Sequence, residues 1–467
     1  MAQGGYGNLQ WSGAVARLVM AAAALCALSA IHAHAQTQAE TPADKFGAIE
    51  PSLASQFSSD SSALRARAAL HARGIDYFLI FTNDVLANTS GGLKRGTIDQ
   101  GKLETQFRVD LEKFAGWQGW MFYANGFATY NSGRIRRDYV GGFNTIAAIE
   151  ANPSVRLSEL WLQYKFAGDK ASIRVGQLAA DSDFFFSNLN AMFMQSDWPT
   201  IAALNLPGGG PAYPLSTPGL RLKIEPWRDT AFLFAVFNGD PAGPCAGDPD
   251  TCNRYGLNFR VSDPPLFMGE IQTGFNQGDT DRGLASMLKL GVWGHAGKFN
   301  DKRFANDGTL LANPLGSGAA RMLRGDYGIY GVVDQQLYRP AGAKAEEGIS
   351  VFGRVSFSPS DRNLINFQFD GGIVVAGLVP NRPHDRFGVS VLHARAADAV
   401  RAFDRDTIAF GGTGPVRDYE TNVELSYIAQ IVPGWTVQPD FQYIFHPGLG
   451  RSGRDAKVVG VRTQLRY

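Results

Sequence analysis

The residues best suited to bind a ligand lie on one short alternating segment. In residues 154–166, SVRLSELWLQYKF, Glu159 and Trp161 fall on the polar side, opposite Leu160 and Leu162. A tryptophan beside a carboxylate suits a polyhydroxylated solute, because the ring stacks on C–H groups while charged groups bond to hydroxyls. We expect these side chains to hold a small solute weakly.

Other polar residues join this group by the same alternation, or because they open the longest connection of the chain, residues 181–216. The candidate binding residues are Glu159, Trp161, Arg174, Asp181, Asp183, Phe184, Arg221 and Lys223. For any one of these charges, the alternative role is to keep a polar interior wet. The cluster as a whole favours binding.

Patterns of catalytic sites are missing from the sequence. No histidine lies in an HExxH pattern, no GxSxG elbow is present, and residues 208–210 are not followed by the GK[ST] of a phosphate loop. Cys245 and Cys252 lie close together in a turn-rich stretch, where two cysteines favour a local disulfide over a metal site. Two unpaired thiols are the alternative. We expect no enzyme activity, no cofactor and no metal.

Composition narrows the class of protein. The chain has 467 residues, with 44 Lys+Arg against 43 Asp+Glu, so nothing favours nucleic-acid binding through phosphate neutralisation. Hydrophobic residues make up 45%, which excludes a disordered chain. The mean hydropathy of −0.14 excludes a bundle of membrane-spanning helices. The excess of glycine and aromatic residues indicates many strands and turns.

Residues 1–35 have the features of an export signal. Arg17 precedes the apolar run 18–30, which is too short for a comfortable membrane span, and a small-x-small cleavage pattern ends at Ala35. A retained membrane anchor is the alternative. We expect cleavage, so that the mature chain begins near Gln36.

The rest of the chain divides into a short extension and one large domain. Residues 36–73 are predicted to form a periplasmic extension, and residues 54–74 resemble a short basic helix with serine caps that ends at Gly74. Residues 74–467 consist of short segments with period-2 alternation, separated by Gly, Pro, Asn and Asp. Such alternation places one set of side chains on each face of a sheet.

The alternating segments predict strands with one face in lipid. In residues 458–467, Val459, Val461 and Leu465 oppose Arg462 and its polar neighbours. The same division recurs in residues 103–112, 219–225, 419–427 and 435–443. The apolar faces end in aromatic residues, as in the girdles of membrane barrels, and the polar faces carry charges of both signs, as a wet lumen would. An exported soluble sandwich or barrel is the alternative.

We therefore expect an all-β fold, a transmembrane antiparallel β-barrel formed by residues 74–467. Roughly seventeen candidate strands fit this stretch, and because bacterial barrels have even counts we expect sixteen, with eighteen as the alternative. The least regular candidates are residues 253–262 and 324–338. A barrel of this size encloses an aqueous channel.

The connection formed by residues 181–216 is too long to be a simple turn. It mixes Phe, Met and Trp with Asn, Asp and Gly, so its aromatic residues need a place to pack. We expect it to fold back into the lumen and narrow the channel. An outer loop packed on itself is the alternative.

Several blocks of the chain, in order, resemble the carbohydrate-selective porins of the OprB type. The similar blocks are residues 64–92, 159–161, 174–184, 211–223, 352–385 and 419–448. The resemblance implies a sixteen-stranded outer-membrane barrel that passes monosaccharides, glucose among them, with the long connection after the fifth strand narrowing the pore. The loop with two cysteines is not carried over from the family, and Tyr467 replaces the more usual terminal Phe.

The expected function is therefore passive, selective diffusion of small sugars through the outer membrane. The expected partners are small sugars and outer-membrane lipids but not nucleic acid, and association into a homotrimer is left open. A general or anion-preferring porin is the first rival, because Arg174, Arg221 and Lys223 could form an anion funnel. A barrel enzyme that hydrolyses lipid, with Ser and His from distant strands, is the second.

Overall fold

The computed structural model describes residues 52–57, 61–196, 198–450 and 453–467. The predicted export signal, residues 1–35, and the first part of the predicted extension lie outside the described residues.

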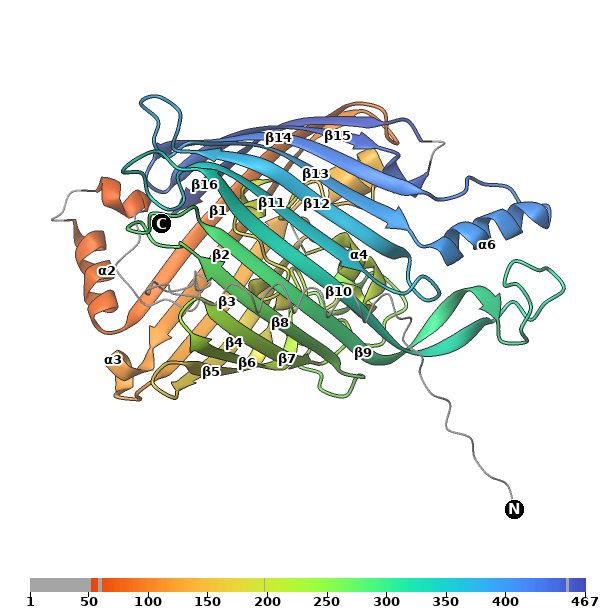
Figure 1. Ribbon diagram of the computed structural model, residues 1–467, viewed down its shortest axis with the longest axis horizontal. Coiled ribbons are helices and arrows are strands. Elements are labelled where there is room, and N and C mark those ends of the chain that lie inside the picture. The colour runs from red at the N-terminus through yellow and green to blue at the C-terminus, as the bar shows by residue number, and fades with distance from the viewer. Residues whose placement is uncertain (1–51, 58–60, 197, 451–452) are drawn as a thin grey trace, which may run out of the picture. The chain divides into compact units, whose positions relative to one another are not determined.

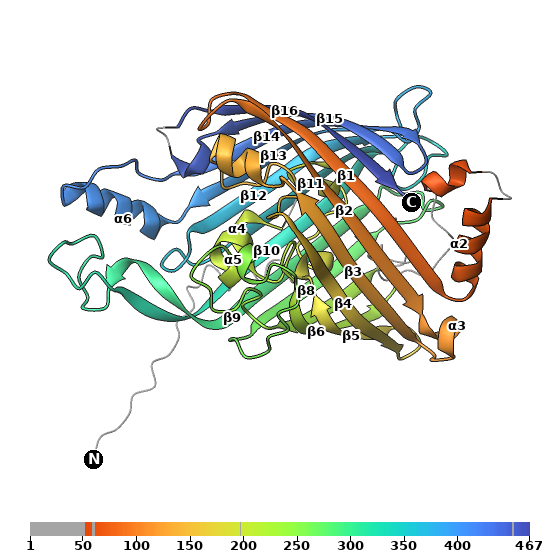
Figure 2. The same cartoon turned by 180° about the vertical axis from the view of Figure 1, so that it is seen from behind.

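Sixteen antiparallel strands close into a barrel (Figures 1 and 2). Every strand pairs with its neighbours in sequence, and β1 (Ile75–Ser90) closes against β16 (Ala456–Arg466). The other strands are β2 (Gly96–Asp110), β3 (Trp120–Tyr130), β4 (Ser154–Phe166), β5 (Ala171–Leu178), β6 (Thr217–Trp227), β7 (Thr230–Phe237), β8 (Leu266–Phe275), β9 (Ser286–Ala305), β10 (Ala320–Tyr338), β11 (Gly348–Phe357), β12 (Ile365–Ala376), β13 (Arg386–Ala396), β14 (Tyr419–Val432) and β15 (Trp435–Phe445). The predicted fold class and strand number are confirmed, and closure gives each of the sixteen strands a partner strand on both sides, as lipid requires.

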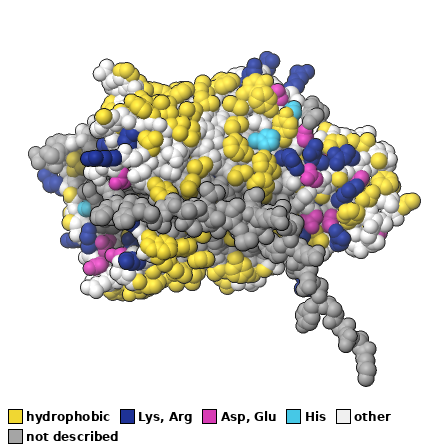
Figure 3. Space-filling view, in the orientation of Figure 1, with side chains coloured by type: hydrophobic (Ala, Val, Ile, Leu, Met, Phe, Trp, Pro, Cys, Tyr) yellow, Lys and Arg dark blue, Asp and Glu magenta, His cyan; other side chains and the backbone are white. Residues whose placement is uncertain are grey.

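The two faces of the wall differ as the alternation predicts. In β16, Val459 and Val461 are exposed on the outside, whereas Arg462 turns inward and pairs with Asp84 of β1 at 2.7 Å. In Figure 3, hydrophobic side chains gather over the middle of the barrel and charged side chains lie towards its two ends. This is the distribution that a bilayer-spanning barrel requires.

One of the two irregular candidates is a strand and the other is not. Residues 324–338 belong to β10, but the strand predicted at residues 253–262 is wrong. That segment lies in the connection between β7 and β8, which pair directly with each other from Thr230–Thr273 to Phe237–Leu266. Since both edges of each neighbouring strand are already paired, an alternating segment there has no continuous partner.

Helical segments lie at the ends of the barrel and within its connections. The described α-helices are α2 (Ser62–Ala72), α3 (Leu111–Ala115), α4 (Thr200–Asn205), α5 (Pro249–Cys252) and α6 (Asp398–Ala409). Short 3-10 turns or a π-helical turn occupy η2 (Leu53–Gln56), η3 (Ile135–Val140), η4 (Ala180–Ser182), η5 (Asn190–Met192), η6 (Pro207–Gly209) and η7 (Pro447–Leu449). None of the helices in the described ranges combines the length and the apolar character that a bilayer crossing needs.

Helix α2 is the basic helix predicted near residues 54–74. The Ser61 hydroxyl accepts a hydrogen bond from the Leu64 amide at 3.3 Å and so caps its first turn. Beyond its last turn, Gly74 adopts a φ of +84°, where its missing side chain avoids the Asp110 carbonyl. The helix therefore ends where the chain must turn into β1.

Two long connections fold against the inside of the barrel. We call residues 179–216, between β5 and β6, the constriction loop, and residues 131–153 the β3–β4 loop. The constriction loop carries α4, which packs against β12 on the far side of the barrel (Figure 2). The predicted infolding of this connection is confirmed.

Candidate functional site

Carboxylates of the barrel wall hold the constriction loop in place. Each side chain extends inward from a strand and accepts hydrogen bonds from backbone amides of the loop. The pairs are Glu159 with Ala179 at 3.3 Å, Glu270 with Phe185 at 3.1 Å, Asp334 with Asn188 at 2.9 Å, and Glu424 with Met194 and Gln195 at 2.6 and 2.9 Å. These acceptors come from β4, β8, β10 and β14, so the loop is fixed around much of the wall.

The β3–β4 loop is fixed in the same way and braces the constriction loop. Glu420 of β14 accepts hydrogen bonds from the amides of Phe143 and Asn144, the shortest at 2.7 Å. The Ala148 amide donates to the Met194 carbonyl at 2.7 Å, which joins the two loops. Backbone amides that water would otherwise satisfy are therefore bonded to protein within the lumen.

A buried charge cluster lies where the constriction loop leaves β5. The Asp183 carboxylate accepts hydrogen bonds from Arg174 at 3.1 Å and from Arg221 at 3.3 Å. Both guanidinium groups also donate to the Gln163 side chain, at 3.2 and 3.1 Å. All four side chains are buried. The loop thus supplies the carboxylate that compensates two arginines of adjacent strands.

Trp161 lies behind this cluster rather than in open lumen. Its ring stacks on Tyr123 with centroids 4.9 Å apart, and the Arg174 guanidinium lies 4.0 Å from its centroid. Trp161 is almost fully buried, and its indole N–H has no hydrogen-bond partner within the described part of the chain. The ring therefore packs against the Arg174 guanidinium and helps to fix its position.

The structure brings six of the eight sequence-predicted residues together at the loop entrance. These are Glu159, Trp161, Arg174, Asp183, Phe184 and Arg221, with Phe184 packing edge-on against Phe237 at 6.4 Å. Lys223 pairs separately with Glu225 at 3.1 Å. Of the eight, only Asp181 keeps appreciable contact with solvent. The other seven residues are buried.

A second group beside Asp181 was missed by the sequence analysis. Lys102 of β2 forms an ion pair with Glu104 at 2.7 Å, and its ammonium lies 4.9 Å from the ring centroid of Tyr213. Tyr213, near the end of the constriction loop, donates its amide to Asp181 at 2.9 Å. Asn125 of β3 donates to Glu104 at 3.0 Å. Lys102, Glu104, Asn125, Asp181 and Tyr213 all keep partial contact with solvent; we call them the lumen group.

Comparison with known proteins decides the family. The sequence profile of the carbohydrate-selective porin, OprB family matches residues 94–467. The chain belongs to this family. The porin is also 24% identical over 425 residues to porin B of Pseudomonas aeruginosa, covering 85% of this chain and 88% of that protein. It is therefore an outer-membrane channel selective for carbohydrates.

Solved structures share the porin's fold. The high-pH structure of Pseudomonas putida OprB superposes with a TM-score of 0.75 at 20% identity, covering 86% of this chain and 96% of that one. The low-pH structure of the same protein gives a TM-score of 0.53 at 16% identity, covering 88% and 100%. Both likenesses concern the fold alone.

The charge of the lumen group is expected to change near neutral pH. Burial raises the pKa of Asp181 to about 6, although the Tyr213 amide and Lys102 oppose the shift. Lowering the pH from 7 to 5 therefore protonates Asp181 and removes one negative charge from the constriction. We expect the permeability of the porin to cations, relative to anions, to fall over this interval, as measured by the reversal potential in a salt gradient. Asp181→Asn should remove the part of this pH-dependent change in selectivity that is due to Asp181. A pH profile identical to that of the unmodified porin would contradict the role given to Asp181.

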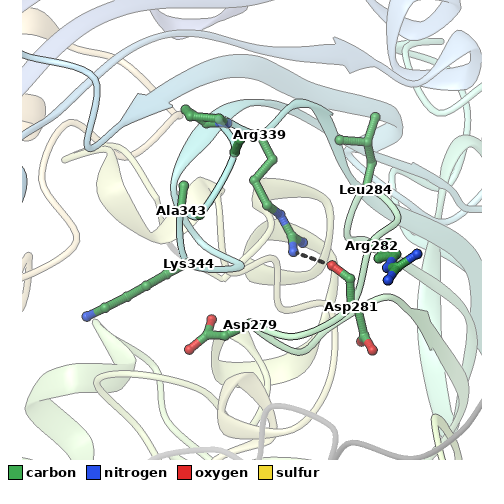
Figure 4. A pocket seen from close by; sticks show the side chains of 10 residues that line it. Asp279, Asp281, Arg282, Leu284, Arg339, Ala343 and Lys344 are labelled. Atoms are coloured by element: carbon green, nitrogen blue, oxygen red, sulfur yellow. Dashed lines mark hydrogen bonds between the residues drawn. The ribbon is translucent and has the colours of Figure 1, made fainter.

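A separate pocket of about 390 Å³ lies between two connections, one after β8 and one after β10 (Figure 4). Its central side chain, Arg339, donates to the carbonyl groups of Gly278 and Asp281 and to the Gln336 side chain. The guanidinium therefore links the two connections by hydrogen bonds.

Within the described residues, no group of three or more His, Cys, Asp or Glu side chains is arranged to hold a metal ion.

Proposed function

We propose that this porin passes glucose-like monosaccharides by diffusion past the lumen group. One observation carries the proposal: the Lys102 ammonium lies 2.7 Å from the Glu104 carboxylate and 4.9 Å from the Tyr213 ring centroid, and all three residues keep partial contact with solvent. An aromatic face suits the C–H groups of a sugar, and the charged groups suit its hydroxyls. Such a small, solvated site binds weakly enough to release its solute, as conduction requires.

We assign the buried residues of the predicted site a positioning role. Asp183 fixes the beginning of the constriction loop on Arg174 and Arg221, and Trp161 supports Arg174. Asp181, two residues before Asp183, then reaches the lumen beside Tyr213. The sequence-predicted cluster would thus set the width of the channel, and the lumen group would contact the sugar.

The anion-preferring alternative is less well supported by this geometry. The funnel that it needs would use Arg174 and Arg221, but both are buried and share the Asp183 carboxylate. Lys223, the third cation, has Glu225 as its partner. The lipid-hydrolase alternative has no support from the family, whose fold and description are those of channels. We infer that the porin has no catalytic activity, and hydrolysis of a lipid ester by purified protein would oppose this.

Tyr213→Leu is expected to weaken the block of ion current by glucose several-fold, because it removes the aromatic face beside Lys102. Ion conductance in the absence of sugar should change little. Trp161→Ala should also weaken the block, through the displaced Arg174. Trp435→Ala is the matched control, since Trp435 lies exposed on the outer face of β15. The block is measured in planar bilayers by titrating glucose. If Tyr213→Leu is blocked by glucose as strongly as the unmodified porin, the lumen group is not part of the sugar site.

We further propose that residues 1–35 are removed during export and that residues 36–73 remain on the periplasmic side. The intact mass of the porin purified from outer membranes should correspond to a chain beginning at Gln36. A mass that includes residues 1–35 would support a retained anchor instead. The mass of the native assembly, measured on the same preparation in mild detergent, distinguishes a monomer from the homotrimer that the sequence leaves open.

A further inference from the structure

The barrel wall is low on one side. β5 and β7 have 8 residues each and β8 has 10, against 16 in β1 and 20 in β9. At about 3.3 Å per residue and a tilt of about 40°, eight residues rise only about 20 Å, whereas the apolar band of such barrels is about 25 Å tall. The two eight-residue strands, β5 and β7, are therefore too short to cover the band by themselves.

The segment around Gly256 lies directly against this low side. β4 extends beyond the end of β5, whose last pairing with it is Gln177 opposite Leu160. There the Leu157 amide donates to the Tyr255 carbonyl at 3.0 Å, and the Gln177 side chain donates to the Gly256 carbonyl at 2.8 Å. The segment thus takes the position that a longer β5 would occupy.

Only glycine fits at the point of contact. Gly256 has a φ of +67°, and a Cβ atom there would lie 1.8 Å from the Leu157 carbonyl oxygen. The backbone of the segment therefore approaches β4 as closely as a neighbouring strand does. Its position against the wall is fixed by packing as well as by hydrogen bonds.

The segment presents an alternating apolar face to the outside. Tyr255, Leu257, Phe259 and Val261 are 59%, 61%, 50% and 80% exposed, whereas the residues between them are buried or half-buried. Val155, on the adjoining end of β4, is 71% exposed. Four large apolar side chains with one orientation form a patch that monomeric proteins seldom leave to water.

We propose that residues 255–261 form a lipid-facing extension of the barrel wall, whose apolar side chains enter the acyl chains of the adjoining leaflet. The patch continues the outer surface of the strands below it, where Val175, Phe234 and Phe267 are each 52% exposed. The short strands leave part of the bilayer's hydrocarbon layer without a barrel wall beside it, and the segment lies at that height. The geometry therefore favours lipid, rather than a second copy of the chain, as the neighbour of the patch.

The polar side of the segment is anchored within the same connection. The Asn253 side chain donates to the Pro241 carbonyl at 2.9 Å, and Arg260 pairs with Asp263 at 2.7 Å. Cys245 and Cys252 form a disulfide, with their Cα atoms 6.2 Å apart, in the chain that leads to the segment. These contacts hold the connection in a form that keeps the apolar face outward.

Spin labels test the proposal on the full-length porin reconstituted in vesicles of phosphatidylcholine and phosphatidylglycerol. A label at Leu257→Cys should collide with oxygen rather than with a water-soluble nickel chelate, as a label at Phe234→Cys on the outer face of β7 does. Leu315→Cys is the aqueous control, because Leu315 is 93% exposed in the connection between β9 and β10. The oxygen-to-nickel collision ratio at residue 257 should be several-fold higher than at residue 315.

Two results would overturn the proposal. A ratio at residue 257 equal to that at residue 315 would place the segment in water. Low accessibility to both reagents, with spin–spin broadening that disappears on dilution with unlabelled porin, would place a second copy there. Val261→Cys is measured in parallel, and only variants that block and conduct like the unmodified porin are compared, so that misfolding does not decide the outcome.

Discussion

Glu424→Ala is expected to raise the single-channel conductance several-fold and to make the current noisy. The fully buried Glu424 carboxylate accepts both the Met194 and the Gln195 amides of the constriction loop. Without it, two buried donors lose their acceptor, at roughly 1–3 kcal/mol each. The middle of the loop should then leave the wall for part of the time and widen the channel. Conductance in planar bilayers measures the change.

Glu424→Gln is the matched control, because its amide oxygen still accepts one of the two hydrogen bonds. Its conductance should lie between those of the unmodified porin and Glu424→Ala. If all three conduct alike, the wall carboxylates do not hold the constriction, and the loop is fixed by its apolar packing alone.

Asp183→Asn is expected to destabilise the barrel and to shift its ion selectivity towards anions. Arg174 and Arg221 are both buried and both donate to this carboxylate. Removing one partner from a buried ion pair costs about 3–5 kcal/mol, because the remaining charge stays uncompensated. The temperature at which the folded barrel is lost, followed by circular dichroism in detergent, should fall. The reversal potential in a salt gradient should move towards anion preference.

Asp398→Asn makes the corresponding change at an exposed ion pair. Asp398 of α6 pairs with Arg395 at 3.1 Å, and the two side chains are 62% and 40% exposed; such surface pairs contribute about 0–1 kcal/mol. This variant should melt and conduct like the unmodified porin. Equal melting temperatures for Asp183→Asn and Asp398→Asn would show that the buried cluster does not stabilise the loop entrance.

The fold was largely predictable because the two sides of a porin wall meet different solvents. Alternation in β16, as at Val459 and Arg462, follows directly from lipid outside and water inside. The same signal failed at residues 253–262, which alternate in exposure but have no continuous strand partner. Alternation reports which side a residue faces, and it does not report whether a neighbouring strand is free to pair.

The site was predictable only in part, for a related reason. The alternation of polar and apolar residues correctly placed Arg174 and Arg221 inward. It could not show that Asp183 would accept hydrogen bonds from both. It also missed Lys102 and Tyr213, because their contact joins β2 to the end of the constriction loop and depends on how the loop crosses the lumen. Distances between segments remote in sequence leave no trace in a local pattern.

The most direct test of this account is a bilayer conductance titration of the purified porin with a panel of monosaccharides and disaccharides. If the anchored loop narrows the constriction and the lumen group lines it, glucose should lower the ion current in a saturable manner. Disaccharides should do so more weakly. Currents that fall only in proportion to solution viscosity, equally for every sugar, would contradict it.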